Sequence, residues 1–135
     1  RHGLQLALLF VDLDGFKQVN DERGHAAGDR LLQETAQRLQ HAVRACDTVA
    51  RIGGDEFVIL IEDLVEAAAA QQVADSIAGQ LRVSTDGVAP LCAASVGIAL
   101  YPRDGLDVDC LLARADKAMY EAKRRRRQAM DLAGD

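Results

Sequence analysis

Two short apolar segments of this chain are joined by the run Arg51-Ile52-Gly53-Gly54-Asp55-Glu56-Phe57. Residues 48–52 and 57–61 are rich in Val and Ile, which is typical of strands, and the Gly-Gly-Asp sequence offers the positive-φ positions of a tight hairpin. Asp55 and Glu56 are therefore expected at a fixed place on the edge of a sheet. A solvated hairpin tip is the ordinary meaning of such a turn, but one polar residue is enough for that. The second carboxylate indicates a functional site.

A second acidic cluster, Asp12-Leu13-Asp14, ends the first apolar run of the chain, residues 6–11. A continuous apolar run predicts a buried strand, and two acids two residues apart share one face at its end, with the Leu13 carbonyl between them. Carboxylates that meet others across a neighbouring strand repel one another unless a cation joins them, and oxygen ligands of this kind suit Mg²⁺. Asp-x-Asp alone is more often a strand end or a helix cap. Together with the hairpin acids it indicates metal-assisted phosphate chemistry.

The composition describes one globular domain. A chain of 135 residues buries roughly two-thirds of its unfolded surface, enough for a core of its own. Apolar residues make up 49% and the mean hydropathy is -0.06. No apolar stretch approaches the ~20 residues of a membrane span. We therefore expect a single domain over residues 1–135 that does not cross a bilayer.

Charge and cysteine content narrow the class of partner. The formal net charge of -5 argues against DNA binding, and a polyphosphate ligand would need local cations or a bound metal. Cys46, Cys92 and Cys110 form an odd set without a Cys-x-x-Cys pair, so neither a disulfide framework nor a zinc site is expected. A cytoplasmic location follows as the expectation for this domain, with membrane anchoring elsewhere in a parent protein left open.

The expected order of elements is β-α-α-β-β-α-β-α. The predicted strands span residues 5–12, 48–52, 57–61 and 91–100, and the predicted helices span 16–22, 26–43, 64–81 and 107–125. A ββ hairpin between two helical crossovers predicts an α+β fold with a ferredoxin-like split βαβ core, in which helices pack on an antiparallel sheet. In that topology the first strand lies beside the hairpin, so Asp12 and Asp55 can converge.

The motifs of the chain, in their order, resemble those of one family, the GGDEF domains, which are the diguanylate cyclases of bacteria. The resemblance runs from Leu6 to about Lys123 without an obvious gap. The matching motifs are Val11-Asp12-Leu13-Asp14-Gly15-Phe16-Lys17, Val19-Asn20-Asp21, Gly24-His25-Ala26-Ala27-Gly28-Asp29, the hairpin Arg51 to Phe57, Ala94-Ser95-Val96-Gly97-Ile98-Ala99, and Ala115-Asp116-Lys117-Ala118-Met119-Tyr120-Glu121-Ala122-Lys123. The resemblance also implies a core shared with nucleotidyl cyclases and polymerase palm domains.

The resemblance implies an enzyme that condenses two GTP into cyclic di-GMP and two pyrophosphates. It assigns two Mg²⁺ (or Mn²⁺) ions to Asp12, the Leu13 carbonyl, Asp55 and Glu56, where two metals stabilise the attacking and leaving oxygens of an in-line displacement. Asp55 is also the candidate base for the attacking 3′-hydroxyl, although metal coordination alone is an alternative. One site holds one nucleotide, so a homodimer of antiparallel protomers is implied.

Phosphate binding is implied for several residues. Lys17 is assigned to the transferring phosphoryl group, at a helix start where backbone N–H groups favour phosphate, and a solvated lysine is its ordinary alternative. Lys123 and Arg127 are assigned to the terminal phosphates. Four residues with uncharged side chains are also expected to contact the nucleotide: Gly15, Phe16, Gly53 and Gly54.

Guanine recognition is implied for Asn20 and Asp29. A carboxylate accepts from guanine N1–H and the 2-amino group, whereas adenine has a lone pair at N1 and no 2-amino group, so GTP is expected to bind in preference to ATP. A turn cap for Asn20 and an exposed helix acid for Asp29 are the structural alternatives.

Arg44 and Asp47 form the pattern Arg-x-x-Asp, with five residues between Asp47 and Gly53, which in the family marks the allosteric site for product inhibition by cyclic di-GMP. Arg grips phosphate or a guanine edge and Asp accepts from guanine N1–H, while a helix-end Arg beside a turn Asp is the structural alternative. Two positions depart from the family, since Arg126 replaces a usual glycine and Gln128 a usual asparagine.

The family's usual amino-terminal helix is absent before Arg1, so we expect a fragment of a longer protein that lacks an attached sensor or effector domain. The rival hypothesis is a non-catalytic GGDEF module that binds GTP or cyclic di-GMP and regulates an attached domain.

Overall fold

The computed structural model describes residues 5–81 and 93–133, with side chains as far as residue 129. Within these residues the elements are β1 (Gln5–Leu13), α1 (Phe16–Arg23), α2 (His25–Ala42), β2 (Thr48–Arg51), β3 (Glu56–Leu64), α3 (Ala67–Leu81), β4 (Ala94–Tyr101) and α4 (Val108–Ala133). The expected order of elements is confirmed. Residues 91–92 of the strand predicted over 91–100 lie outside the described residues.

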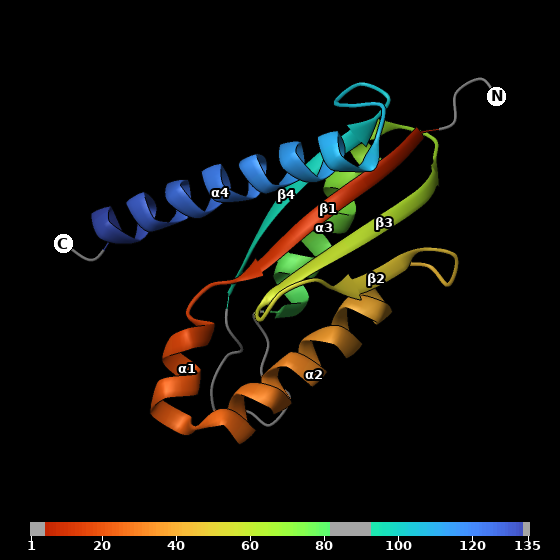
Figure 1. The fold of residues 1–135 in the computed structure, drawn as a ribbon. Helices are drawn as coiled ribbons and strands as arrows, with labels where there is room; N and C mark the ends of the chain where they lie inside the picture. The colour runs from red at the N-terminus through yellow and green to blue at the C-terminus, as the bar shows by residue number, and fades with distance from the viewer. Residues whose placement is uncertain (1–4, 82–92, 134–135) are drawn as a thin grey trace.

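The strands form one antiparallel sheet in the order β2-β3-β1-β4 (Figure 1). β3 lies between β1 and β2 and runs against both, so β1, α1, α2 and β2 form a crossover that is split by β3. This is the predicted split βαβ core of an α+β fold. β1 is central, because β3 pairs with one of its edges and β4 with the other.

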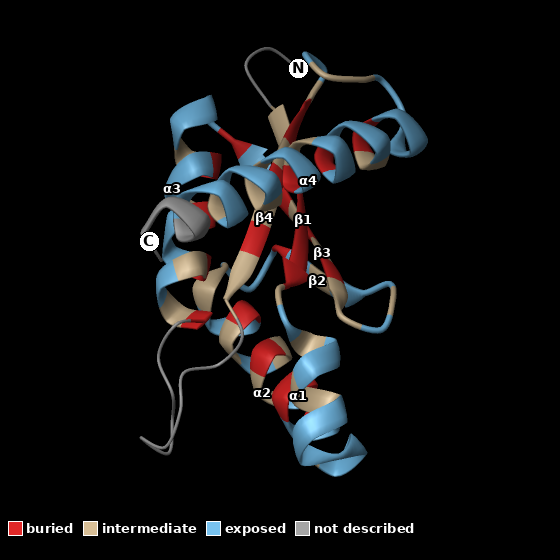
Figure 2. Cartoon of the chain, turned by 90° about the vertical axis from the view of Figure 1, so that its left-hand side faces the viewer, coloured by how far each residue is buried: buried red, intermediate tan, exposed pale blue. Residues whose placement is uncertain are grey.

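Helices cover both faces of the sheet, which explains why β1 is apolar without alternation. On one face Leu9 and Val11 pack with β3, α2 and α3, and on the other Leu8 and Phe10 pack with Met119 and its neighbours on α4. Figure 2 shows the buried residues on the strands and on the inner sides of the helices. Asp12 continues the series of Leu8 and Phe10, and its side chain therefore lies on the α4 face.

The hairpin differs from the prediction. β2 ends at Arg51 and β3 begins at Glu56, so the four-residue connection, 52–55, begins one residue earlier than predicted. The positive φ angles among the described residues occur at Gly15, Gly24 and Asp63, so Gly53 and Gly54 do not supply them. Gly53 instead lies close to the Glu56 side chain, whose end would have to shift for a Cβ at residue 53, since that Cβ would lie 2.7 Å from Glu56 Oε1.

Two helix bounds also moved. α3 begins at Ala67 rather than residue 64, because β3 continues to Leu64, and α4 continues to Ala133, beyond the predicted end at 125. No helix of the described residues is long and apolar enough to cross a membrane.

Candidate functional site

The predicted acids meet at the carboxyl end of β1, where the start of β3 and the second half of α4 also lie (Figure 1). Asp12 and Glu56 are directly opposite each other in the antiparallel β1–β3 pair. The amide of Leu13 donates to the Asp55 carbonyl at 3.1 Å, which ties the hairpin to the end of β1. Sheet register thus brings Asp12 next to Asp55 and Glu56, which are more than 40 residues away in sequence, as the split βαβ topology predicted.

Burial and mutual repulsion set the electrostatics of this acidic cluster, defined as Asp12, Asp55 and Glu56. Burial, the charge of Asp12 and a hydrogen bond with Asp12 raise the pKa of Asp55. The pKa of Glu56 is raised by burial and then by the negative charges of Asp12, Asp55 and, on α4, Asp116. Both acids therefore hold a proton more tightly than a free carboxyl group, which is typical of carboxylates that share too little positive charge.

Lys123 of α4 supplies the nearby cation. Its Nζ lies 2.9 Å from Asp12 Oδ2 and 3.7 Å from Asp14 Oδ1. The hydrogen bond to Asp12 raises the pKa of Lys123 against the opposing effect of burial. Asp12 and Asp14 therefore share a face, as their spacing predicted, and Lys123 reaches that face from α4.

Two further residues of this network were not predicted. Asp14 Oδ2 accepts from Ser95 Oγ of β4 at 2.9 Å and from Arg126 Nη1 of α4 at 3.1 Å. Arg126 is three residues after Lys123 and so lies on the same side of the helix, a spacing that could have marked it. Arg127, the predicted phosphate ligand, is exposed, and its charge lowers the pKa of Lys123.

The acidic cluster supplies the side chains that would hold a metal. Within residues 5–81 and 93–133, no group of three or more His, Cys, Asp or Glu side chains is arranged to hold a metal ion. The donor chemistry fits a hard divalent cation, because the three carboxylates offer oxygen ligands and repel one another. In this structure the Lys123 ammonium occupies one of them, Asp12. The residues present are therefore suited to Mg²⁺ once Lys123 leaves Asp12.

Five of the predicted nucleotide contacts lie at the start of α1 or on α1 and α2, which follow β1: Gly15, Phe16, Lys17, Asn20 and Asp29. Gly15 has φ 84° at the start of α1, a conformation that favours glycine, and Phe16 and the exposed Lys17 form the first turn. Asn20 packs against Gly28, so closely that a Cβ on Gly28 would collide with its side-chain oxygen. The structure thus brings Asn20 next to the turn that carries the exposed Asp29.

The side chains of Arg44 and Asp47 are bonded to each other. Arg44 Nη2 and Nε lie 3.1 and 3.2 Å from the two oxygens of Asp47, which also accepts from the amides of Arg44 and Glu62 at 2.9 and 3.2 Å. Burial alone would raise the pKa of Asp47, but these hydrogen bonds outweigh it and hold the pKa below its usual range. Asp47 therefore anchors the start of β2 to β3.

A groove of about 530 Å³ lies beside this pair, between the end of α2 and the start of α3. The Arg44 side chain remains 55% exposed along it, whereas that of Asp47 is 2% exposed. The guanidinium is thus the accessible part of the predicted allosteric site.

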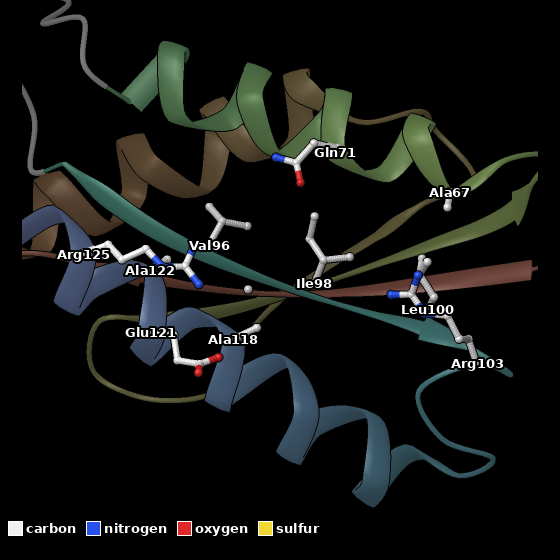
Figure 3. Close-up of a pocket in the computed structure, with 11 residues that line it drawn as sticks. Ala67, Gln71, Val96, Ile98, Leu100, Arg103, Ala118, Glu121, Ala122 and Arg125 are labelled. Atoms are coloured by element: carbon white, nitrogen blue, oxygen red, sulfur yellow. The ribbon is translucent and has the colours of Figure 1, made fainter.

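A second pocket of about 480 Å³ runs along β4, the edge strand, between α3 and α4. Figure 3 shows Gln71 of α3 on one side of the strand and Glu121 and Arg125 of α4 on the other. None of the predicted site residues lines this pocket.

Comparison with known proteins gives consistent matches. The sequence profile described as "Diguanylate cyclase, GGDEF domain" matches residues 1–129. "Diguanylate cyclase TpbB" of Pseudomonas aeruginosa is 44% identical over 135 residues, which cover 98% of this chain and 31% of TpbB. The chain therefore spans about a third of the length of that curated relative.

Two solved structures show the same fold. The GGDEF domain of PA1120 (YfiN or TpbB) from Pseudomonas aeruginosa has a TM-score of 0.86 at 44% identity, covering 92% of this chain and 79% of that one. The GGDEF domain of DgcB from Caulobacter crescentus in complex with c-di-GMP has a TM-score of 0.76 at 26% identity, covering 90% and 74%.

Proposed function

Because this chain belongs to the GGDEF domain family of diguanylate cyclases, we propose that it condenses two GTP into cyclic di-GMP. In each half-reaction the 3′-hydroxyl of one GTP attacks the α-phosphorus of the other, the bond to pyrophosphate breaks, and the hydroxyl proton is lost. The observation that carries the proposal is the convergence of Asp12, Asp55 and Glu56 beneath the Lys123 ammonium.

The acidic cluster has two tasks in this proposal. Asp12, the Leu13 carbonyl, Asp55 and Glu56 would hold two Mg²⁺ (or Mn²⁺) ions, which when bound would polarise the phosphate and lower the pKa of the attacking hydroxyl. Asp55 is the candidate acceptor of the hydroxyl proton.

Cations around the cluster would orient the triphosphate. Lys17 in the first turn of α1 is exposed and free to approach the transferring phosphoryl group, and the backbone of Gly15 and Phe16 opens that helix. Lys123 would turn from Asp12 to the terminal phosphates, with Arg127 further along α4. The α1–α2 pair would accept the base at Asn20 and Asp29.

The guanine assignment has a direct test. Asp29→Ala should weaken GTP binding and narrow the preference for GTP over ATP, because the exposed carboxylate is the acceptor for N1–H and the 2-amino group. Competition calorimetry with the two nucleotides measures this preference. An unchanged preference would move guanine recognition elsewhere.

Product feedback is proposed for Arg44 and Asp47, supported by the exposed guanidinium, the adjoining groove and the similarity to a domain solved with c-di-GMP. Product at this groove would inhibit by holding two protomers in an unproductive arrangement. Arg44→Ala should lose product binding by roughly 1.5–3 kcal/mol while initial turnover stays near the parent value. A binding isotherm that overlays the parent's would remove the inhibitory site.

Turnover is proposed to require a homodimer, and control to come from an attached domain. A chain fused to a dimeric coiled coil, incubated with GTP and Mg²⁺, should form cyclic di-GMP that mass spectrometry detects. If the dimer binds GTP or cyclic di-GMP but produces none, the chain is a regulatory binding module instead. Asp55→Ala in the same dimer should abolish turnover and leave the fold intact.

A further inference from the structure

Arg126 and Ser95 hold one oxygen of Asp14 and leave the other without a donor. Both donate to Oδ2, at 3.1 and 2.9 Å. Asp14 Oδ1 is buried and has no hydrogen-bond partner among the described residues. A buried carboxylate oxygen without a donor is costly, so Oδ1 is an acceptor ready for a nearby cation.

Lys123 is that cation. Its Nζ lies 3.7 Å from Asp14 Oδ1 while it donates to Asp12 Oδ2 at 2.9 Å. A shift of about 1 Å would bring Nζ to normal hydrogen-bonding distance from Oδ1. Asp14 therefore offers Lys123 a second position, next to the one it must leave before Asp12 can act as a cation ligand.

We propose that Arg126 is a positioning residue, which through Asp14 keeps Lys123 available for the phosphates of the nucleotide. This inference rests on the proposed function. Arg126 compensates the charge of Asp14, so that Asp14 receives Lys123 without retaining it. Its side chain is 23% exposed and directed to Asp14 rather than to solvent, as a residue that acts through another requires.

Removing Arg126 leaves the charge of Asp14 compensated only by the Ser95 hydroxyl and Lys123. Asp14 then competes with phosphate for the lysine and also repels the phosphate itself. Both effects weaken nucleotide binding, and both depend on the negative charge of Asp14. A direct contact of Arg126 with phosphate would not depend on that charge.

The test is calorimetry of the full chain with Mg²⁺ and a GTP analogue that carries a non-cleavable α,β-methylene bridge. Arg126→Ala should bind the analogue about five- to tenfold more weakly, and Arg126→Lys should stay within about twofold of the parent. In the Asp14→Asn background, Arg126→Ala should change affinity by less than about twofold, because the charge through which Arg126 acts is gone. Arg124→Ala is the matched control, since it removes the same charge from an exposed position of α4.

The outcomes separate the hypotheses. Equal affinity of Arg126→Ala and the parent overturns the inference alone. If Arg126→Ala loses the same affinity in the Asp14→Asn background, Arg126 contacts the phosphate directly and the inference is overturned. If Arg124→Ala loses as much affinity as Arg126→Ala, the effect is one of general charge and the inference is overturned as well. Failure of the parent chain to bind the analogue refutes the proposed function and this inference with it. Urea unfolding of each variant identifies a loss of fold. If Arg126→Ala alone is unstable, the Asp14→Asn/Arg126→Ala chain still allows the affinity comparison with Asp14→Asn, because it removes both partners of the ion pair.

Discussion

Glu56→Gln is expected to stabilise the protein in the absence of divalent metal. Glu56 is directly opposite Asp12 in the sheet, and burial together with repulsion from Asp12, Asp55 and Asp116 raises its pKa. Like charges opposite each other on antiparallel strands cost about 0.2–1 kcal/mol, which Lys123 offsets only in part. Gln has the same shape and keeps the packing of residue 56 on Gly53, so the substitution removes charge alone.

The expected gain in unfolding free energy is therefore about 0.5–1 kcal/mol at pH 7, or about 2–4 °C in Tm. Its pH dependence has a definite sign. Because the pKa of Glu56 is raised in the folded state, the parent loses stability as the pH rises from the usual carboxyl pKa through the folded one. The difference in unfolding free energy between Glu56→Gln and the parent should grow as the pH rises through that window and vanish below it.

Urea unfolding in chelator, followed by titration with Mg²⁺, measures both effects. Mg²⁺ should stabilise the parent by mass action and stabilise Glu56→Gln less, because one ligand is gone. Glu62→Gln, at an exposed position of the same strand, is the matched control and should show neither effect. A Glu56→Gln chain that is no more stable than the parent without metal, or a control with the same gain, would refute the charge-cluster argument.

Four further substitutions test the fold, each by urea unfolding. Gly97→Ala should lower the free energy of unfolding by about 1–3 kcal/mol, because a Cβ there collides with the Ala115 carbonyl of α4. Gly79→Ala has open space around it and should raise the free energy of unfolding by about 0.5–1 kcal/mol. Equal effects would contradict the close packing of β4 on α4. Thr35→Val should gain about 1 kcal/mol, because Thr35 is fully buried and its hydroxyl has no partner among the described residues; a loss would show that the hydroxyl is bonded. Asp47→Asn should lose about 1–3 kcal/mol at pH 7, and because the pKa of Asp47 is lowered, the loss should shrink as the pH falls through that pKa; a pH-independent loss would assign the effect to packing.

The fold followed from the sequence because local patterns and topology agreed. The apolar run before Asp12 predicted a strand buried on both faces, and the ββ hairpin between helices predicted its central place in the sheet. Those two facts together placed Asp12, Asp55 and Glu56 at one end of the sheet. The turn conformation was wrong because Gly53 and Gly54 were expected at positive φ, whereas neither has it and Gly53 instead lies close to the Glu56 side chain.

The contacts of Asp14 could not be predicted in the same way. Its partners Ser95 and Arg126 are 81 and 112 residues away in sequence, and they meet only because α4 covers the face of the sheet on which Asp12 lies. Sequence pattern marks a helix face as apolar, but it does not say which face of a sheet the helix covers. The bond of Asp47 to the Glu62 amide, 15 residues away in sequence, was likewise found only in the structure.

Formation of cyclic di-GMP by the chain fused to a dimeric coiled coil tests the central claim most directly. With GTP and Mg²⁺, the fused parent should produce cyclic di-GMP and two pyrophosphates for each product molecule. The fused Asp55→Ala chain should produce essentially none while unfolding at a similar urea concentration. A parent dimer without product, or an Asp55→Ala dimer that turns over at more than about a tenth of the parent rate, a barrier change below about 1.4 kcal/mol, would contradict the catalytic assignment of the acidic cluster.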